Sequence, residues 1–147
     1  MRVYEVMNKD VETVNPLVAA SEAKTRMRHK RIHHLVVTRD GELQGVVSER
    51  DLGGPKLPKL LGKYTVADLM TTPVVTVTTR TLVRRAAALM KGRSIGSLVV
   101  TSANGKVAGI VTVSDLLDRL ANQPVRVARQ REAARSRKTK AGTWEEE

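Results

Sequence analysis

Two pairs of polar residues with the same spacing are the clearest candidates for chemistry in this sequence. In each pair an aspartate follows a hydroxyl residue by three positions: Ser48 with Asp51, and Thr112 with Asp115. An ionised carboxylate only accepts hydrogen bonds and can take two vicinal hydroxyl donors. A hydroxyl beside the backbone N–H groups at the start of a helix can hold an anion. The pairs therefore favour ligand binding, although helix caps and first-turn acids would give the same pattern.

The histidines do not predict a metal site, and no nucleotide-hydrolysing loop is found. His29, His33 and His34 fall across an expected helix–strand boundary, and adjacent strand residues point to opposite faces of a sheet. They are therefore not expected to share a metal ion. The sequence has no Walker lysine loop and no dinucleotide-binding Gly-x-Gly-x-x-Gly, and enzyme activity is not expected.

Composition narrows the class of protein further. The 147 residues contain no cysteine and no phenylalanine, and the only aromatic residues are Tyr4, Tyr64 and Trp144. Disulfides, thiolate metal sites and a cysteine nucleophile are excluded, and the core must be aliphatic. A base-stacking platform for single-stranded nucleic acid is not expected. No apolar run is long enough to span a membrane and the N-terminus does not resemble a signal peptide, so we expect a cytoplasmic protein without membrane contact.

The formal net charge of +11 is unevenly distributed. Residues 126–140 contribute +6 and Glu145–Glu147 contribute −3, which leaves +8 on the preceding chain. Within that part, cations gather at Lys24–Arg31 and at Arg80–Arg93. Two alternatives to ligand binding follow: nucleic-acid binding through the basic tail and the Lys24–Arg31 face, or docking of 126–140 on an acidic protein partner. Solvated helix faces would carry the same charges.

An internal repeat organises the chain. A shift of 63 places superposes Met27 on Met90, and Leu35–Thr38 on Leu98–Thr101. One added residue in the next turn changes the shift to 64, which then aligns the two Ser/Thr-x-x-Asp pairs. The register survives one insertion at a position where hairpin loops tolerate it. We conclude that the repeat is genuine.

Each repeat is expected to form strand, helix, strand, strand and helix. Short runs of Val, Leu and Thr favour strands, and Asp40-Gly41 and Asn104-Gly105 favour hairpin turns. Ser48 and Thr112 lie where the last strand meets the last helix. The expected strands are 12–14, 35–37 and 43–47 in the first repeat and 75–77, 98–100 and 107–111 in the second, with helices around 19–27 and 82–90 between them.

Neither repeat can cover both faces of its sheet alone. The predicted fold is therefore α/β (α+β), with two β-α-β-β-α repeats packed through their sheets around a pseudo-twofold axis. The Gly- and Pro-rich residues 53–58 are expected to be a linker. The predicted division is 1–62 and 63–123 for the repeats and 124–147 for a basic tail that is partly helical or disordered.

The motifs 32–38 with 45–52, and 95–101 with 109–117, resemble the cystathionine-β-synthase (CBS) domain in its tandem form, the Bateman module. The resemblance covers roughly residues 5–121. It implies a stand-alone regulatory protein that senses an adenosine-containing ligand: AMP as first choice, or ADP, ATP or S-adenosylmethionine. It also implies a homodimer and requires no further cofactor.

The resemblance also implies roles for residues in two clefts. Asp51 and Asp115 would bind ribose hydroxyls. Phosphate would be bound by Ser48, Arg50, His33, Thr112 and Ser114. The base of a ligand at Asp51 would contact Thr72, Pro73, Val74, Ile95, Gly96 and Ser97, and that of a ligand at Asp115 would contact Asp10, Val11, Ile32, His33 and His34. His33 resembles the phosphate-contacting histidine of some members, whereas its counterpart is Gly96, so the clefts are not equivalent and either one could be the occupied one.

Overall fold

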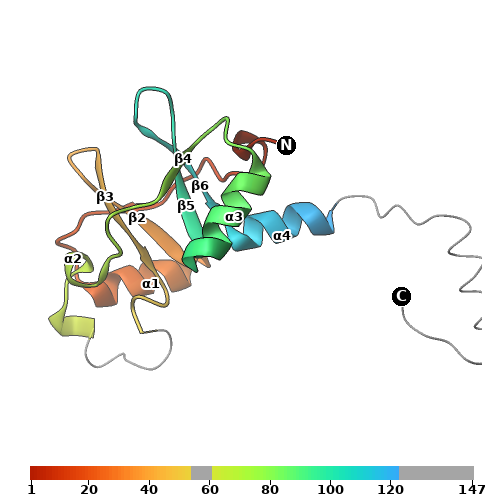
Figure 1. Ribbon diagram of the computed structural model, residues 1–147. Coiled ribbons are helices and arrows are strands. Elements are labelled where there is room, and N and C mark those ends of the chain that lie inside the picture. The colour runs from red at the N-terminus through yellow and green to blue at the C-terminus, as the bar shows by residue number, and fades with distance from the viewer. Residues whose placement is uncertain (54–60, 123–147) are drawn as a thin grey trace, which may run out of the picture.

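The computed structural model describes residues 1–53 and 61–122, and each half of the chain contains a three-stranded sheet with a helix between its first two strands (Figure 1). The elements in chain order are the 3-10 helix η1 (Val3–Glu5), β1 (Thr13–Val14), α1 (Ala20–Lys30), β2 (His34–Arg39), β3 (Glu42–Ser48), the 3-10 helix η3 (Leu61–Lys63), α2 (Val66–Leu69), β4 (Thr76–Thr78), α3 (Val83–Arg93), β5 (Ser97–Thr101), β6 (Val107–Thr112) and α4 (Val113–Ala121).

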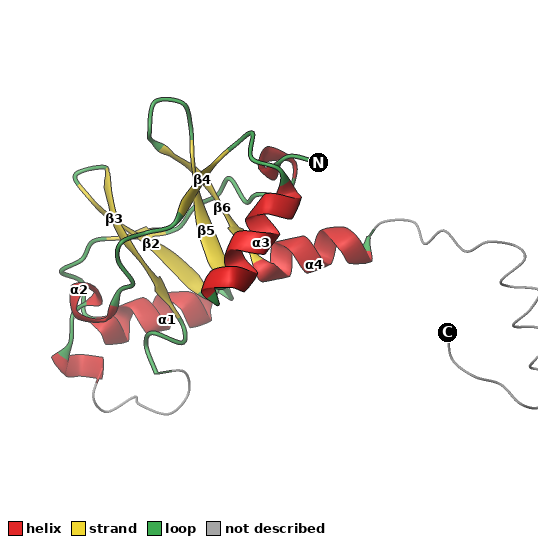
Figure 2. Ribbon diagram, in the orientation of Figure 1, coloured by secondary structure: helices red, strands yellow, loops and turns green. Residues whose placement is uncertain are grey.

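Two three-stranded sheets form the centre of the molecule, in the orders β1-β2-β3 and β4-β5-β6. In each sheet the first two strands are parallel and the last two antiparallel. Figure 2 shows the strands of both sheets in the middle of the molecule, with α1 beside the first sheet and α3 and α4 beside the second. This arrangement confirms the predicted α/β (α+β) class.

The central strands β2 and β5 are buried on both faces. Leu35 and Val37 pack into a core with α1, whereas Val36 between them faces the other sheet and meets Val99 and Ile110. Alternate residues of a strand point to opposite faces, so one strand serves both layers. The predicted packing of the two repeats through their sheets is therefore confirmed.

Both predicted hairpins form. Asp40 and Gly41 have positive φ angles of 52° and 80°, and Gly105 has a φ of 81°. Glycine and aspartate accept this left-handed conformation with the least steric penalty, which explains their place in these turns.

The N-terminal segment of each repeat packs on the other repeat, a feature that the sequence did not predict. Asn8 and Ile110 exchange backbone hydrogen bonds of 2.8 and 3.0 Å, and Val3 is fully buried in the second core. In the same way Thr71 pairs with Val46 of β3 through bonds of 2.8 and 3.2 Å. We call residues 1–10 and 61–71 the two arms. The first arm contributes to the core of the second repeat, and the second arm contributes to the core of the first. The predicted division at 62 stays a prediction.

A glycine in each sheet allows an arm to lie this close. A Cβ atom on Gly45 would lie 2.7 Å from the Met70 sulfur and 2.9 Å from the Thr71 carbonyl oxygen. On Gly109 it would lie 2.8 Å from the Asn8 carbonyl oxygen. Such distances exclude any side chain without movement of the arm.

The last helix of the first repeat differs from the prediction. The second repeat continues into α4, but residues 49–53 form hydrogen-bonded turns that end at Gly53, whose φ is 80°. A residue in this left-handed conformation does not continue an α-helix, and glycine adopts it with little steric penalty. The predicted linker beyond Gly53 and the predicted tail 124–147 lie outside the described residues.

Among the helices of residues 1–53 and 61–122, none combines the length and the apolar character that crossing a bilayer requires.

Candidate functional site

Both Ser/Thr-x-x-Asp pairs form reciprocal hydrogen bonds of the capping-box type. In the first, the Ser48 N–H donates to Asp51 Oδ2 (2.9 Å) and the Asp51 N–H donates to Ser48 Oγ (3.0 Å). In the second, the Thr112 N–H donates to Asp115 Oδ2 (2.8 Å) and the Asp115 N–H to Thr112 Oγ1 (3.1 Å). The two pairs therefore have the same local geometry. Any functional difference between them has to come from the residues that surround them.

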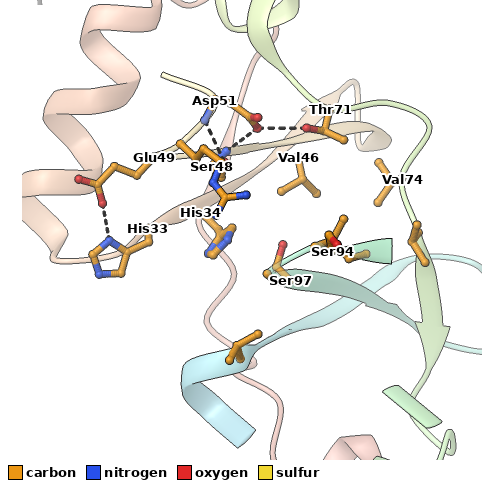
Figure 3. Close-up of a pocket in the computed structure, with 15 residues that line it drawn as sticks. His33, His34, Val46, Ser48, Glu49, Asp51, Thr71, Val74, Ser94 and Ser97 are labelled. Carbon is orange, nitrogen blue, oxygen red and sulfur yellow. Dashed lines mark hydrogen bonds and ion pairs between the residues drawn. The ribbon is translucent and has the colours of Figure 1, made fainter. Parts of the chain in front are cut away.

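A cavity of about 640 Å³ lies beside the first pair, between the two repeats (Figure 3). Its volume lies in the range that holds small organic ligands. It is lined by His33, His34, Val46, Ser48, Glu49, Arg50, Asp51, Thr71, Val74, Val75, Ser94, Ile95, Gly96, Ser97 and Val113. We call this space the Asp51 cavity.

Most residues predicted for a ligand at Asp51 line this cavity. They are Ser48, Arg50, Asp51, Val74, Ile95, Gly96 and Ser97. Thr72 and Pro73 do not line it. His33 and His34, whose base contacts were predicted in the other cleft, also line the Asp51 cavity.

The remaining residues predicted for a ligand at Asp115 are not brought to this cavity. These are Asp10, Val11, Ile32, Thr112, Ser114 and Asp115. Two of them have packing roles, because Val11 packs against the layer between the sheets and Ile32 against the first core. Ligand binding at Asp115 by these residues stays a prediction.

Thr71 is a cavity residue that the sequence did not predict. Its hydroxyl donates to Asp51 Oδ2 (3.1 Å), the oxygen that already accepts from the Ser48 N–H, as Figure 3 shows. Within the described part of the chain, the hydrogen bonds to the Asp51 carboxylate are accepted by Oδ2 and none by Oδ1. The counterpart of Thr71 in the first repeat is Asn8, whose Oδ1 accepts from the Asp10 N–H instead (2.9 Å). The sequence signal that could have identified Thr71 is a hydroxyl residue in the second arm, which can donate to the Asp51 carboxylate.

His33 is held by an acidic neighbour. Its Nδ1 lies 2.6 Å from Glu49 Oε2, and both side chains are largely accessible. The counterparts of these residues are Gly96 and Val113, which keep the backbone hydrogen bond (3.1 Å, against 2.9 Å for Glu49 to His33) but not the charges. The cavity is therefore ionic at its first-repeat end and apolar at the matching second-repeat end.

His34 lines the cavity between His33 and the second repeat's Gly96. Its Nε2 is 3.5 Å from the position that a Cβ on Gly96 would take. Burial lowers the pKa of His34 below its ordinary value of 6.5, and the neighbouring His33 lowers it further, while Asp51 and Asp115 act in the opposite direction. At neutral pH His34 is therefore uncharged and offers one N–H donor and one ring-nitrogen acceptor.

Ser94 is another lining residue that the sequence analysis did not single out. The letters Gly92–Gly96 fit the Gly-x-Ser-x-Gly pattern of serine hydrolases. In that elbow the serine follows a strand and precedes a helix. Here Ser94 follows α3 with a left-handed φ of 54° and precedes β5, which is the reverse order. The pattern does not mark a serine nucleophile.

The acidic and imidazole groups of the described residues form no cluster of three or more that could hold a metal ion. On the Lys24–Arg31 face of α1, Arg26 is paired with Glu22 (3.2 Å) and Lys30 with Glu12 (3.0 Å). These cations are partly neutralised, which weakens the case for phosphate binding there. Residues 126–140 lie outside the described part, and nucleic-acid or acidic-protein binding by them stays a prediction.

Comparison with known proteins places this geometry in context. The model of the CBS domain family matches residues 3–52 and 66–122. A CBS domain-containing protein from Dictyostelium discoideum is 34% identical over 130 residues, which cover 80% of this chain and 90% of that protein. The inosine-5′-monophosphate dehydrogenase of Thermoplasma acidophilum is 27% identical over 118 residues, which are 80% of this chain but only 23% of the enzyme.

Solved structures show the same fold. A CBS-domain containing protein from Agrobacterium tumefaciens superposes with a TM-score of 0.74 at 27% identity, covering 82% of this chain and 99% of its own. The CBS domain pair of protein MJ0100, solved with 5′-methylthioadenosine and S-adenosyl-L-methionine, superposes with a TM-score of 0.75 at 24% identity, covering 84% and 98%. At that identity the second likeness concerns the fold alone.

Proposed function

This chain belongs to the CBS domain family as a tandem pair, and we propose that it is a regulatory module that binds one adenosine-containing ligand in the Asp51 cavity. The observation that carries the proposal is the open Oδ1 of Asp51 in a cavity built from both repeats. The fold neighbour MJ0100 holds ligands of this chemical class.

Ribose binding follows from the state of Asp51. Two donors, the Ser48 N–H and the Thr71 hydroxyl, fix the carboxylate through Oδ2. The carboxylate is thereby oriented before the ligand arrives, and Oδ1 has two lone pairs for vicinal hydroxyls. Preorganisation of this kind lowers the entropic cost of binding.

A single phosphate is the best match for the charges of the cavity. Arg50 supplies a cation and Ser48 a hydroxyl, but Glu49 lies between them in sequence and also lines the cavity. Each further phosphate of ADP or ATP would bring negative charge near Glu49 and Asp51, and so AMP is our first choice. S-adenosylmethionine, whose substituent carries positive charge, is the alternative that the same acids would favour.

The base would be held by aliphatic side chains. Val46 of the first repeat and Val74 and Ile95 of the second line the cavity, and no aromatic residue occurs among its lining. Gly96 and the neutral ring of His34 leave polar groups within reach of the purine edge. Since the ligand would touch both repeats, its binding would shift the population of their relative arrangements, and this is the proposed regulatory mechanism.

Calorimetric titration of the full chain with AMP, ADP, ATP and S-adenosylmethionine tests the proposal, with GMP as a control for base selection. We expect one ligand per chain, AMP tighter than ATP, and GMP weakest. Absence of binding heat for all four adenosine compounds at millimolar concentration would overturn the function.

We also propose a homodimer. The support is the exposed apolar side of α4, where Val113 and Leu117 are 43% and 59% accessible. Exposed apolar side chains that neighbour each other on one helix face often mark an interface. Light scattering on the full chain tests the proposal, and a mass equal to one chain across the accessible concentration range would overturn it.

A further inference from the structure

Sulfur chemistry in this chain is confined to methionine, because the sequence contains five methionines and no cysteine. The surroundings of these side chains differ. Met1 is 46% accessible, whereas Met27 and Met90 are almost completely buried in the two cores. Met7 and Met70 lie between these extremes, since each is partly buried against one core. A partly accessible thioether can react with a peroxide, and its packed neighbours then meet a polar group in place of an apolar one.

Met70 is in close contact with the first sheet. A Cβ atom on Gly45 would lie 2.7 Å from the Met70 sulfur, 3.1 Å from its Cγ and 2.9 Å from the Thr71 carbonyl oxygen. The sulfur therefore lies against the glycine backbone. An oxygen added to this sulfur is a strong hydrogen-bond acceptor, and burying it without a donor is costly. The oxidised side chain is therefore expected to turn toward water and leave its contact with Gly45.

The residue after Met70 connects the second arm to the Asp51 cavity. The Thr71 N–H donates to the Val46 carbonyl (2.8 Å), and the Thr71 carbonyl accepts from the Val46 N–H (3.2 Å). The Thr71 hydroxyl donates to Asp51 Oδ2 (3.1 Å), as drawn in Figure 3. Thr71 is itself exposed, so these hydrogen bonds and the packing of Met70 hold it in place. Displacement of Met70 should therefore withdraw Thr71 from Asp51.

The first arm has the same sulfur contact without the same connection. A Cβ atom on Gly109 would lie 2.9 Å from the Met7 sulfur and 2.8 Å from the carbonyl oxygen of the next residue, Asn8. Among the described residues, however, Asn8 makes no hydrogen bond to the Asp115 side chain, whose bonds come from its own capping box. Oxidation of Met7 is thus expected to loosen the first arm without reaching the Asp51 cavity.

We propose that Met70 is an oxidation site through which peroxides weaken ligand binding in the Asp51 cavity. In the reaction a lone pair of the Met70 sulfur attacks one oxygen of hydrogen peroxide. The S–O bond forms as the O–O bond breaks, and the departing hydroxide takes the proton of the transferred oxygen and leaves as water. The sulfur loses two electrons and the peroxide gains them. The effect on ligand affinity rests on the proposed function, whereas the release of the second arm does not.

Treatment of the full chain with hydrogen peroxide tests the proposal, with mass spectrometry of peptides to locate the added oxygen. Met1 should be oxidised first, Met7 and Met70 next, and Met27 and Met90 last. Calorimetric titration with AMP should then show affinity reduced by about 2- to 12-fold, the effect of losing one hydrogen bond to Asp51. Met70→Leu keeps a similar volume and cannot take up oxygen, so this variant should keep its affinity after the same treatment.

Met7→Leu is the matched control, because it makes the same change at the equivalent contact of the other arm. After peroxide it should lose AMP affinity as the unmodified chain does. Each variant is compared with its own untreated sample, which separates the effect of oxidation from that of the substitution. Equal responses of the two variants would overturn the proposal, as would a Met70 that stays reduced until Met27 and Met90 are oxidised.

Amide hydrogen exchange at Val46 and Thr71 tests the release of the arm without any ligand. Exchange at both amides should become faster after oxidation of the unmodified chain and of Met7→Leu, but not of Met70→Leu. If the untreated chain does not bind AMP, the proposed function fails, and exchange still decides whether Met70 controls the arm. Unchanged exchange in a chain whose Met70 is oxidised would overturn the proposal.

Discussion

Replacing Asp51 with asparagine should separate ligand binding from folding. In the Asp51→Asn variant the amide oxygen can still accept from the Ser48 N–H and the Thr71 hydroxyl, which now use Oδ2 at 2.9 and 3.1 Å. The open oxygen becomes an N–H₂ group that cannot accept from ribose. A hydrogen bond to a charged acceptor contributes about 1.5–3 kcal/mol, so AMP affinity should fall about 10- to 150-fold.

The second capping box provides a matched control. Asp115→Asn makes the same change in a box with bonds of 2.8 and 3.1 Å, but Asp115 does not line the Asp51 cavity. Both variants should lose less than about 1 kcal/mol of unfolding free energy in urea, because the asparagine amide oxygen can still accept the capping-box hydrogen bond from the Ser48 or Thr112 N–H. Calorimetry with AMP measures the affinities. Unchanged affinity in Asp51→Asn, or an equal loss in both variants, would refute the assignment of ribose to Asp51.

Three further outcomes are expected. Gly45→Ala should lower the unfolding free energy by about 1–3 kcal/mol, because the added Cβ would lie 2.7 Å from the Met70 sulfur in the second arm. Gly62→Ala is the control and should not lower it, because nothing lies within 4 Å of a Cβ at that position. Thermal unfolding of the two variants measures the difference. Thr71→Val should weaken AMP binding by about 2- to 12-fold by releasing the Asp51 carboxylate, as measured by calorimetry, and no change would exclude a positioning role. The pKa of His34 is below 6.5 in the folded state because the side chain is buried, so the folded state should lose stability as pH falls below that value. His34→Asn should flatten this part of the curve of unfolding free energy against pH, measured in urea. An identical curve for the variant would contradict the lowered pKa of His34.

The hairpins, strands and capping boxes of this fold could be predicted from the sequence because residues close together in the chain determine them. The hairpins follow from Asp40-Gly41 and Asn104-Gly105, and the strands of the central layer from their runs of Val and Leu. The capping boxes follow from the spacing of a hydroxyl and an aspartate. Each of these depends on residues a few positions apart, and the repeat supplies an internal check on every assignment.

The difference in surroundings between the two capping boxes could not be predicted from local sequence. It depends on Thr71 reaching Asp51 across 20 residues and on Glu49 pairing with His33 across 16. Sequence reasoning identified the non-equivalence of His33 and Gly96 and assigned His34 to the cleft of Asp115. It did not predict that His34 also lines the Asp51 cavity. Only the packed structure brings these groups together, because their contacts are long-range and their residue types are common.

The exchanged arms have a consequence for how this chain must be synthesised. The first repeat emerges from the ribosome with all its strands, yet its core still lacks Leu61, Val66 and Met70. The first arm is made before the second repeat and has no docking place until Ile110 has been added. A ribosome stalled at the end of the first repeat would therefore display an incomplete domain, and folding is expected to be a late event that involves the whole pair.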